Sequence, residues 1–237
     1  MVNELEVQEA YKNFVEASFY VRPETYDRQI VSEIWGDYPF YLPSDEFEIR
    51  PKWKVIDIGA HIGTFSVYAG KKGAKVWAYE PFRENFDLLR KNNQLNGLKI
   101  KCFQKAVRGT DMGVNMEKQI KFITYDHNNK NTGSGYIGEK IKEKEDRTER
   151  LVDVEYFKDI LFEIKDIDFL KLDCEGSEYD ILYSIRKDNL VKIKRIVMET
   201  HSGYVKGIKL ARYLEDNGYK VNWVKGILGL GRCWAIR

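Results

Sequence analysis

Cysteine is scarce in this sequence, and no two cysteines stand close enough to suggest a shared site. Only Cys102, Cys174 and Cys233 are present, and they form no C-x-x-C pair. An odd number of widely spaced cysteines indicates neither a disulfide framework nor a cysteine zinc site. A chain of 237 residues buries enough apolar surface to fold without such cross-links.

Long apolar runs and a large charge excess are also missing. No stretch of 18 apolar residues occurs, so the sequence predicts no transmembrane helix. The first residues, MVNELEVQEAYKNF, carry acids where a secretory signal would carry an apolar core. The formal net charge of +2 gives no electrostatic case for a nucleic-acid or anionic-membrane partner. We therefore expect a cytoplasmic protein that acts on small molecules.

What is present, after Pro51, is an alternation of strand and helix patterns. Short apolar runs predict strands, with helical spacing between them, at residues 53–58, 75–79, 100–107, 167–172 and 193–198. Such alternation is typical of an α/β fold with a mainly parallel, Rossmann-like sheet. Two closely spaced runs at residues 219–224 and 233–236 predict an antiparallel hairpin at the C-terminus. We expect one domain over residues 51–237.

Two segments lie outside this alternation. Residues 1–50 are expected to form an N-terminal helical cap, because apolar residues recur at helical spacing on both sides of Pro23: Val7, Tyr11, Phe14, Tyr26, Ile30 and Ile34. Residues 108–150 form an insertion that is polar and then densely charged. It is either a solvated surface excursion or a lid over an acceptor site. In the second reading residues 126–138 close, and contacts come from Tyr125, His127 and Tyr136.

A glycine-rich turn follows the first predicted strand of the domain. Residues 55–66 read VIDIGAHIGTFS, so a buried strand leads through Asp57 to Gly59, Ala60 and Gly63 and then to a helix. Such a turn lets the backbone approach a ligand closely, and the helix N-terminus can face a polar group. We hypothesise that a ligand passes over the α-carbon of Gly59, so that a side chain there blocks binding while the protein still folds.

An acid ends the next strand. Glu80 stands 21 residues after Gly59, where a carboxylate can accept hydrogen bonds from both hydroxyls of a ribose. The alternative is that Glu80 only favours the helix that starts at Pro81. The G-x-G-x-x-G pattern of NAD-binding proteins fails, because His61 and Thr64 occupy its second and third glycine positions. S-adenosylmethionine has a ribose and an adenine but no phosphate, so it does not need those glycines.

These segments together resemble the FkbM-type methyltransferases. The resemblance runs from about residue 53 to the C-terminus and rests on VIDIGAHIGTFSVYAG, AYEPFRENFDLLRKNNQLNG, DFLKLDCEGSEYDIL and IVMETH. It implies a Rossmann-like methyltransferase that uses S-adenosylmethionine. His61 is a departure, because asparagine is more usual there. The backbone role of His61 in the turn should survive this change.

The resemblance also implies roles for individual residues. The turn around the methionine part of the cofactor would comprise Asp57, Gly59, Ala60, His61 and Gly63. Glu80 would hold the ribose and Phe82 would lie against the adenine. Lys105 and Ala106 would border the adenine, and Asp173 would lie near the methionine amine and the sulfonium.

Acids gather after two later strands. KLDCEGSE contributes Asp173, Glu175 and Glu178, and IVMETH contributes Glu199 and His201. Neighbouring parallel strands would bring these ends together. Glu175, His201 and Glu199 are therefore candidates for the general base that accepts a proton from the acceptor. The alternatives are helix capping, contact with the cofactor amine, or a divalent metal held by four of these residues: Asp173, Glu175, Glu199 and His201. Their spacing matches no known metal signature, so we predict no metal.

The acceptor atom is inferred from absent motifs. The sequence has no [DN]-P-P-[YFW] tetrapeptide, which amino-methylating enzymes use, and no cysteine pair that suggests carbon methylation. Acids beside the methyl group favour an oxygen nucleophile, and the resemblance implies O-methylation of a sugar or polyketide hydroxyl. The rival readings are an oxidoreductase linked to NAD or a nucleotide sugar, disfavoured by the failed glycine pattern, and an inactive cofactor-binding module, disfavoured by the acids.

Overall fold

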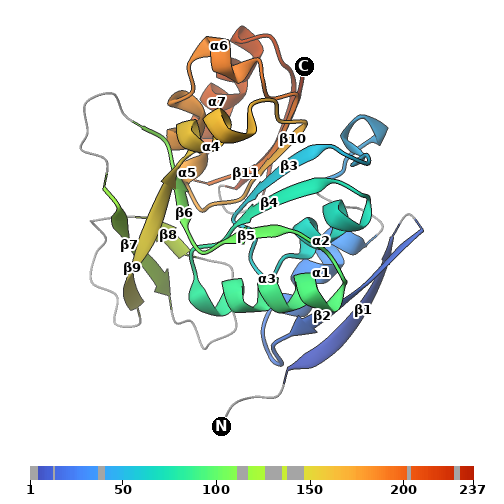
Figure 1. Ribbon diagram of the computed structural model, residues 1–237. Coiled ribbons are helices and arrows are strands. Elements are labelled where there is room, and N and C mark those ends of the chain that lie inside the picture. The colour runs from blue at the N-terminus through green and yellow to red at the C-terminus, as the bar shows by residue number, and fades with distance from the viewer. Residues whose placement is uncertain are drawn as a thin grey trace.

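A seven-stranded sheet forms the centre of the computed structural model, which describes residues 5–12, 14–36, 41–110, 117–125, 135–137, 147–201, 204–226 and 230–237. The strand order is β12-β13-β11-β10-β3-β4-β5 (Figure 1). Five strands are parallel: β3 (Lys54–Ile58), β4 (Lys75–Tyr79), β5 (Lys101–Phe103), β10 (Phe169–Leu172) and β11 (Arg195–Thr200). The hairpin of β12 (Lys220–Lys225) and β13 (Gly231–Ile236) adds β13 antiparallel to β11. The predicted α/β class and C-terminal hairpin are confirmed.

Side chains of successive strand residues enter two different cores. Val55 belongs to one apolar cluster and Ile56 to the other. The first cluster is covered by α1 (Asp27–Trp35), α2 (Thr64–Lys71) and α3 (Arg83–Leu95). The second is covered by α4 (Phe157–Ile164), α5 (Ser177–Tyr183), α6 (Lys187–Leu190) and α7 (Tyr204–Asp216). Helices on both faces therefore leave the carboxyl ends of the parallel strands as the edge that can carry a site.

The first part of the predicted helical cap is wrong. The chain forms a hairpin of β1 (Glu6–Lys12) and β2 (Val15–Val21), followed by helix α1 and by a short 3-10 helix, η1 (Asp45–Phe47). Val7, Tyr11 and Phe14 are exposed, so their helical spacing marks no buried face. The decisive pattern is the alternation in VEASFYV, which buries Ala17, Phe19 and Val21, as a half-buried strand requires. The second predicted helix is confirmed as α1.

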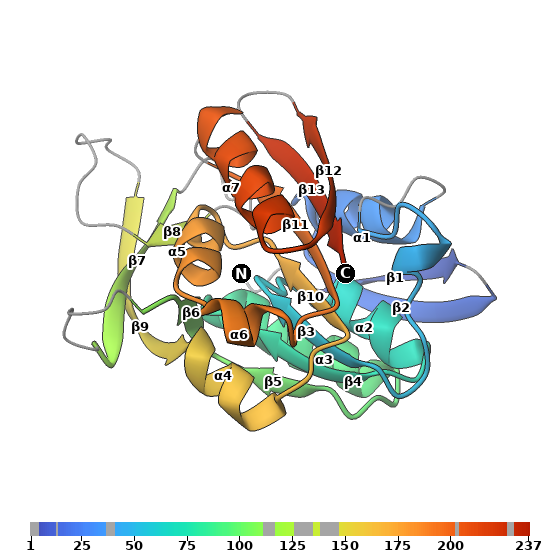
Figure 2. The ribbon, with the colours of Figure 1, turned by 90° about the horizontal axis from the view of Figure 1, so that it is seen from above.

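The single strand predicted at residues 100–107 is also wrong. The polar pair Gln104 and Lys105 separates β5 from β6 (Ala106–Arg108), and β6 pairs in a second sheet of order β6-β9-β7-β8. That sheet contains β7 (Gln119–Tyr125), β8 (Gly135–Ile137) and β9 (Arg147–Tyr156). It has an apolar centre of its own, made by Ala106, Ile120, Phe122 and Val152. Figures 1 and 2 show this sheet and the β1–β2 hairpin on opposite sides of the molecule.

The insertion at residues 108–150 is therefore built around strands where it is described. Residues 126–134 and 138–146, which the lid hypothesis concerns, lie outside the described residues, so the lid stays a prediction. Among the described residues, none of the helices has the length and apolar character needed to cross a membrane.

Candidate active site

The turn after β3 is held by backbone geometry and by one buried carboxylate. Gly59 and His61 have positive φ angles of 76° and 53°, and Gly63 starts helix α2 with a φ of 90°. Glu80, at the end of β4, accepts hydrogen bonds from the backbone N–H of His61 at 2.8 Å and of Phe82 at 2.9 Å. The acid of β4 thus fixes the turn of β3.

Gly59 is required for packing between two turns. A Cβ on Gly59 would lie 1.8 Å from the backbone oxygen of Asp173, which follows β10. No side chain fits there without moving the backbone. The hypothesis that a substitution at Gly59 blocks a ligand but leaves the fold intact is therefore wrong. The space next to the α-carbon of Gly59 is occupied by the backbone of Asp173.

Glu80 is a buried carboxylate at the position where the sequence predicts contact with a ribose. Its side chain is almost fully buried, and burial raises its pKa to about 7. Its two oxygens each accept one backbone N–H, and the Asn85 side chain also donates a hydrogen bond to this carboxylate. The residue holds the start of the next helix, as the alternative reading proposed. Its contact with a ribose stays a prediction.

Asp57 lies beneath the turn rather than at its surface. Its carboxylate is fully buried, accepts a hydrogen bond from the Ser66 hydroxyl at 2.6 Å and lies 3.1 Å from the Lys171 ammonium. Lys171 is also buried and donates to the carbonyl of Gly59 at 2.8 Å. Although burial opposes the charge, Asp57 and Asp173 raise the pKa of Lys171. The structure therefore gives Asp57 a supporting role through Lys171.

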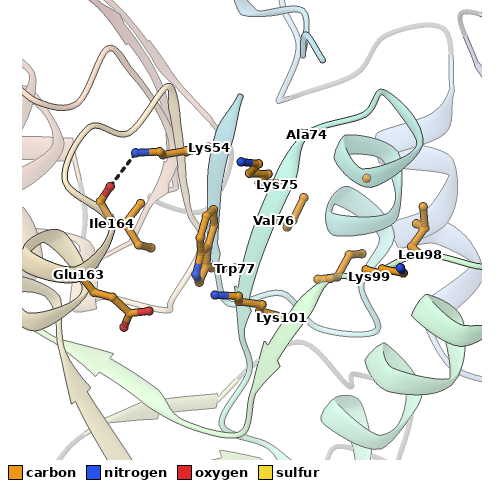
Figure 3. A pocket seen from close by; sticks show the side chains of 12 residues that line it. Lys54, Ala74, Lys75, Val76, Trp77, Leu98, Lys99, Lys101, Glu163 and Ile164 are labelled. Carbon is orange, nitrogen blue, oxygen red and sulfur yellow. Dashed lines mark hydrogen bonds between the residues drawn. The ribbon is translucent and has the colours of Figure 1, made fainter. Parts of the chain in front are cut away.

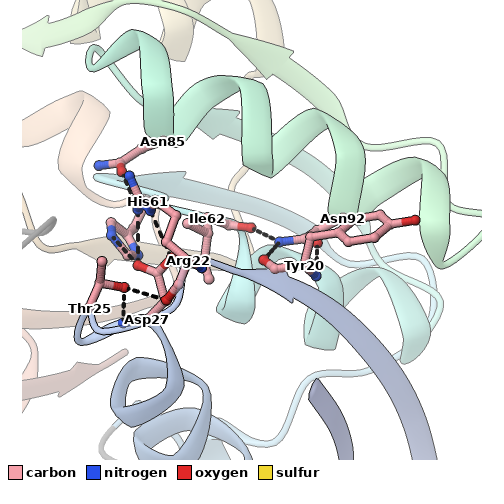
Figure 4. Close-up of polar contacts among 8 residues, drawn as sticks. All are labelled: Tyr20, Arg22, Thr25, Asp27, His61, Ile62, Asn85 and Asn92. Atoms are coloured by element: carbon pink, nitrogen blue, oxygen red, sulfur yellow. Dashed lines mark hydrogen bonds and ion pairs between the residues drawn. The ribbon is translucent and has the colours of Figure 1, made fainter. Parts of the chain in front are cut away.

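His61 faces the N-terminal segment. Its Nε2 lies 3.7 Å from Asp27 of helix α1, and burial lowers the pKa of His61 to about 4. Arg22 donates to both carboxylate oxygens of Asp27 and to Asn85 of helix α3 (Figure 4). The side chain of His61 thus lies against Asp27 in the N-terminal segment, while its backbone N–H donates to Glu80.

The three residues assigned to the adenine lie near one another. Ala106 is buried in the apolar centre of the second sheet, and Phe82 packs against that centre. The guanidinium of Arg150 covers the Phe82 ring at 4.9 Å. Lys105 forms an ion pair with Glu155. The structure brings the three residues together at the start of the second sheet, and their contact with adenine stays a prediction.

Asp173 ends β10 beside a tyrosine from a distant part of the chain. The Tyr41 hydroxyl donates to Asp173 at 2.6 Å, and the Lys171 ammonium lies 3.8 Å from the same oxygen and 5.0 Å from the Tyr41 ring centre. Burial and the Asp173 carboxylate raise the pKa of Tyr41 well above its ordinary value. The phenol therefore stays protonated and holds Asp173 in one orientation.

Glu178 and His201 form a pair inside the site. Glu178 is fully buried, and its two oxygens accept the backbone N–H groups of Cys174 and Gly176, each at 2.9 Å. His201 follows β11 and places its Nδ1 3.0 Å from Glu178. Burial alone would disfavour the imidazolium, but Glu178, Glu175 and Asp173 raise the pKa of His201 to about 10. A histidine that keeps its proton at neutral pH does not suit the predicted base role.

Two further carboxylates complete the cluster. Glu175 has a positive φ of 53° and lies 3.4 Å from Nε2 of His201. Burial raises the pKa of Glu175 to about 7, and burial together with Asp173 does the same for Glu199. Single ligand atoms of Asp173, Glu199 and His201 all lie within 4.8 Å of one another. The sequence prediction that these acids meet at one edge is confirmed.

Sequence reasoning missed Lys171 and Tyr41. Lys171 interrupts the buried run FLKL, as Asp57 interrupts VIDI, and a buried charge requires a partner. The two residues stand opposite each other in the parallel register of β10 and β3, so this signal was available. Tyr41 is 132 residues from Asp173 in the sequence, and no local pattern indicates their contact.

A separate cavity lies at the amino ends of the parallel strands, away from the carboxyl ends that carry the candidate site. It has a volume of about 520 Å³ and is lined by residues where β3, β4 and β5 begin, including Lys54, Lys75, Lys101 and Trp77 (Figure 3). None of the predicted site residues lines it. The candidate site is therefore the carboxyl edge, with the turns after β3 and β10 and the end of β11.

Comparisons with known proteins agree with the sequence resemblance. A model described as a methyltransferase FkbM domain matches residues 57–221. Methyltransferase sdnD of Sordaria araneosa is 27% identical over 231 residues, which cover 86% of each chain. Methyltransferase 1 of Beauveria bassiana (strain ARSEF 2860) is 23% identical over 198 residues, covering 76% of this chain and 74% of that protein.

Among solved structures, precorrin 8W decarboxylase, from the Methanobacterium thermoautotrophicum genome, aligns with a TM-score of 0.47. It is 13% identical, and the alignment covers 88% of this chain and 89% of that chain. The FkbM domain match spans more than half of the sequence, from Asp57 in the first turn to the start of the C-terminal hairpin. This chain belongs to the FkbM methyltransferase family.

Proposed function

We propose that the protein transfers a methyl group from S-adenosylmethionine to a hydroxyl oxygen of a sugar or another small metabolite. The observation that carries this proposal is the set of carboxylates at the shared edge of β10 and β11, next to the glycine turn of β3. S-adenosylmethionine supplies an activated methyl group. An alcohol acceptor additionally has to lose a proton, and a carboxylate beside it can take that proton.

The proposal assigns the cofactor to residues on both turns. We infer that Glu80, the buried carboxylate beside the turn, accepts hydrogen bonds from the ribose hydroxyls and that the adenine lies against Phe82 and Ala106, which pack in one apolar cluster. Asp173, fixed by Tyr41, offers a carboxylate to the cationic methionine end. Alignment of the reacting groups by these contacts would supply most of the rate acceleration.

We assign the proton acceptor to Glu175 on geometric grounds. Glu178 is fully buried and already accepts two backbone N–H groups. Asp173 is bound to Tyr41, and Glu199 lies within β11 opposite Arg232 of β13. Glu175 lies in the loop before α5, and 30% of its side chain is exposed. It is the acid best placed to meet an entering acceptor.

Calorimetric titration with S-adenosylhomocysteine and NAD tests the cofactor assignment. S-adenosylhomocysteine should bind and NAD should not. Glu80→Gln should weaken S-adenosylhomocysteine binding by about ten- to a hundredfold, because a charge-assisted pair of hydrogen bonds is lost. Glu163→Gln, the same change at an exposed position on α4, is the matched control. Equal affinity of the Glu80→Gln variant and the wild type would mean that the ribose is held elsewhere.

Release of S-adenosylhomocysteine in the presence of sugars, polyols and other alcohols tests the reaction. Glu175→Gln should lower kcat by about 10²- to 10⁴-fold, the usual contribution of a general base, while the affinity for S-adenosylhomocysteine stays unchanged. A methyl group found on nitrogen or carbon, or full kcat in Glu175→Gln, would contradict the proposal.

A further inference from the structure

Asp173, Glu199 and His201 converge on one point at the edge of the sheet. They come from the end of β10, from within β11 and from just after β11. One ligand atom of each lies within 4.8 Å of the other two. Two atoms bonded to one small divalent cation at about 2.1 Å are at most about 4.2 Å apart. The three side chains therefore need only a small closing movement to share an ion.

A buried acid outside this trio orients the histidine. Glu178 is fully buried and locked by the backbone N–H groups of Cys174 and Gly176. Its Oε1 lies 3.0 Å from Nδ1 of His201, so the ring directs its other nitrogen, Nε2, toward Glu175. A carboxylate that receives one ring N–H is the usual outer partner of a metal-binding histidine, because it fixes the ring and leaves the opposite nitrogen for the metal.

The charged side chains around the three proposed ligands are mostly acidic. The acids Asp173, Glu175 and Glu199 face this region. Lys171, the buried cation next to it, is shared with Asp57 at 3.1 Å and lies farther from Asp173, at 3.8 Å. His201 is a second cation here, because the neighbouring acids raise its pKa to about 10, so the ion would have to displace the proton on its Nε2. Two carboxylates and one imidazole form a mixed oxygen and nitrogen ligand set, which suits ions such as Mn²⁺ better than a purely oxygen-binding ion.

We propose that Asp173, Glu199 and His201 bind one divalent cation of the Mn²⁺ type beside the position of methyl transfer. This revises the sequence prediction of a site without metal. The role of the ion rests on the proposed function: it would hold the acceptor through its hydroxyl oxygen and ease transfer of the hydroxyl proton to Glu175. The binding of the ion rests on the geometry of the three side chains alone, and the Asp173 carboxylate would then be shared between the ion and the methionine end of the cofactor that the proposed function assigns to it.

Titration of Mn²⁺ into the chelator-treated protein, followed by electron paramagnetic resonance, tests the site. One Mn²⁺ should bind per chain, both with and without S-adenosylhomocysteine. Glu199→Gln and His201→Gln should each weaken Mn²⁺ binding at least about tenfold, and Glu163→Gln should leave it unchanged. Thermal unfolding and S-adenosylhomocysteine titration of each variant would establish that it is folded.

Two results would overturn the metal site. One is the absence of saturable Mn²⁺ binding to a wild-type protein that binds S-adenosylhomocysteine. The other is wild-type Mn²⁺ affinity in a folded Glu199→Gln variant. Binding of Mn²⁺ at these residues without any binding of S-adenosylhomocysteine would support the metal site and contradict the proposed function, so the two failures are distinguishable.

Discussion

The turns after β3 and β10 are both held by a buried glutamate, but the two glutamates come from different elements. Each leads from a buried parallel strand into a helix whose N-cap is a glycine with a positive φ, Gly63 in one and Gly176 in the other. A buried glutamate in each accepts two backbone N–H groups. Glu80 comes from the neighbouring strand, whereas Glu178 comes from the helix that follows its own turn.

The partners of the two glutamates differ, and this difference separates their roles. Glu178 also contacts the ring of His201, which stays charged. Glu80 accepts hydrogen bonds from two backbone N–H groups and from the neutral side chain of Asn85, and burial raises its pKa to about 7. The β10 turn is therefore organised around charges, whereas the β3 turn presents a carboxylate that can serve neutral hydroxyl groups. The two turns meet where Gly59 packs against Asp173.

The largest expected effect comes from separating the two turns. In Gly59→Ala the new Cβ would overlap the backbone oxygen of Asp173, 1.8 Å away. We expect a loss of about 4 kcal/mol or more in the free energy of unfolding. Gly97→Ala is the matched control, because Gly97 has a similar φ of 65° but nothing within 4 Å of its added Cβ. It should lose only about 1 kcal/mol. Urea unfolding that gave equal losses for both variants would mean that the turns do not depend on this contact.

A loss of similar or somewhat smaller size is expected from removing the cation that the two turns share. Lys171→Met leaves the fully buried Asp57 without its 3.1 Å partner, which should cost about 3–5 kcal/mol of unfolding free energy. Adding Asp57→Asn should recover part of that loss, because the buried charge is then absent. If the double variant were less stable than Lys171→Met alone, the lysine would act through Gly59 and Asp173 rather than through Asp57.

The smallest effect is a pH dependence that belongs to the β3 turn. The pKa of Glu80 is raised to about 7, so its contribution to stability is complete at low pH and is lost as the pH rises through 7. The affinity for S-adenosylhomocysteine should change in the opposite direction, because the proposed contact with the ribose requires the carboxylate form of Glu80. It should fall by at most about tenfold per pH unit below 7. His61 stays neutral over this window, since its pKa is about 4.

Calorimetry at several pH values, on the wild type and on Glu80→Gln, isolates this contribution. The variant should show a flatter pH profile of affinity than the wild type. Parallel profiles for the two proteins would assign the pH dependence to the β10 turn instead, and the contrast between the turns would disappear.

The sequence predicts the central sheet well and its attachments poorly, for a physical reason. Strands such as VIDI and FLKL are buried on both faces, so their apolar runs are unambiguous. The β1–β2 hairpin is half exposed, and Val7, Tyr11 and Phe14 fall at helical spacing by coincidence. Local periodicity does not determine whether such a segment forms a helix or a strand. Its pairing with another strand and its packing on the domain determine this.

The same limit applies to the candidate site. Glu80, Asp173, Glu175, Glu199 and His201 follow strands that the sequence reveals, so their meeting at one edge could be predicted. The side chain that pairs with each acid could not be predicted. Tyr41 reaches Asp173 from an irregular segment, and Glu178 assigns a charge to His201 that the sequence does not specify. Charge states arise from three-dimensional neighbours, so the raised pKa of His201 could not be predicted from the sequence.

The position of Lys171 opposite Asp57 also constrains how the sheet can assemble. Strands β3 and β10 lie more than a hundred residues apart in the chain, and both are short and apolar. Sliding β10 by one residue would turn every side chain to the opposite face. Leu172 or Leu170 would then stand where the ammonium now lies, and two charges would be buried without partners, at a cost of several kcal/mol. The ion pair therefore selects one alignment of two otherwise interchangeable hydrophobic strands.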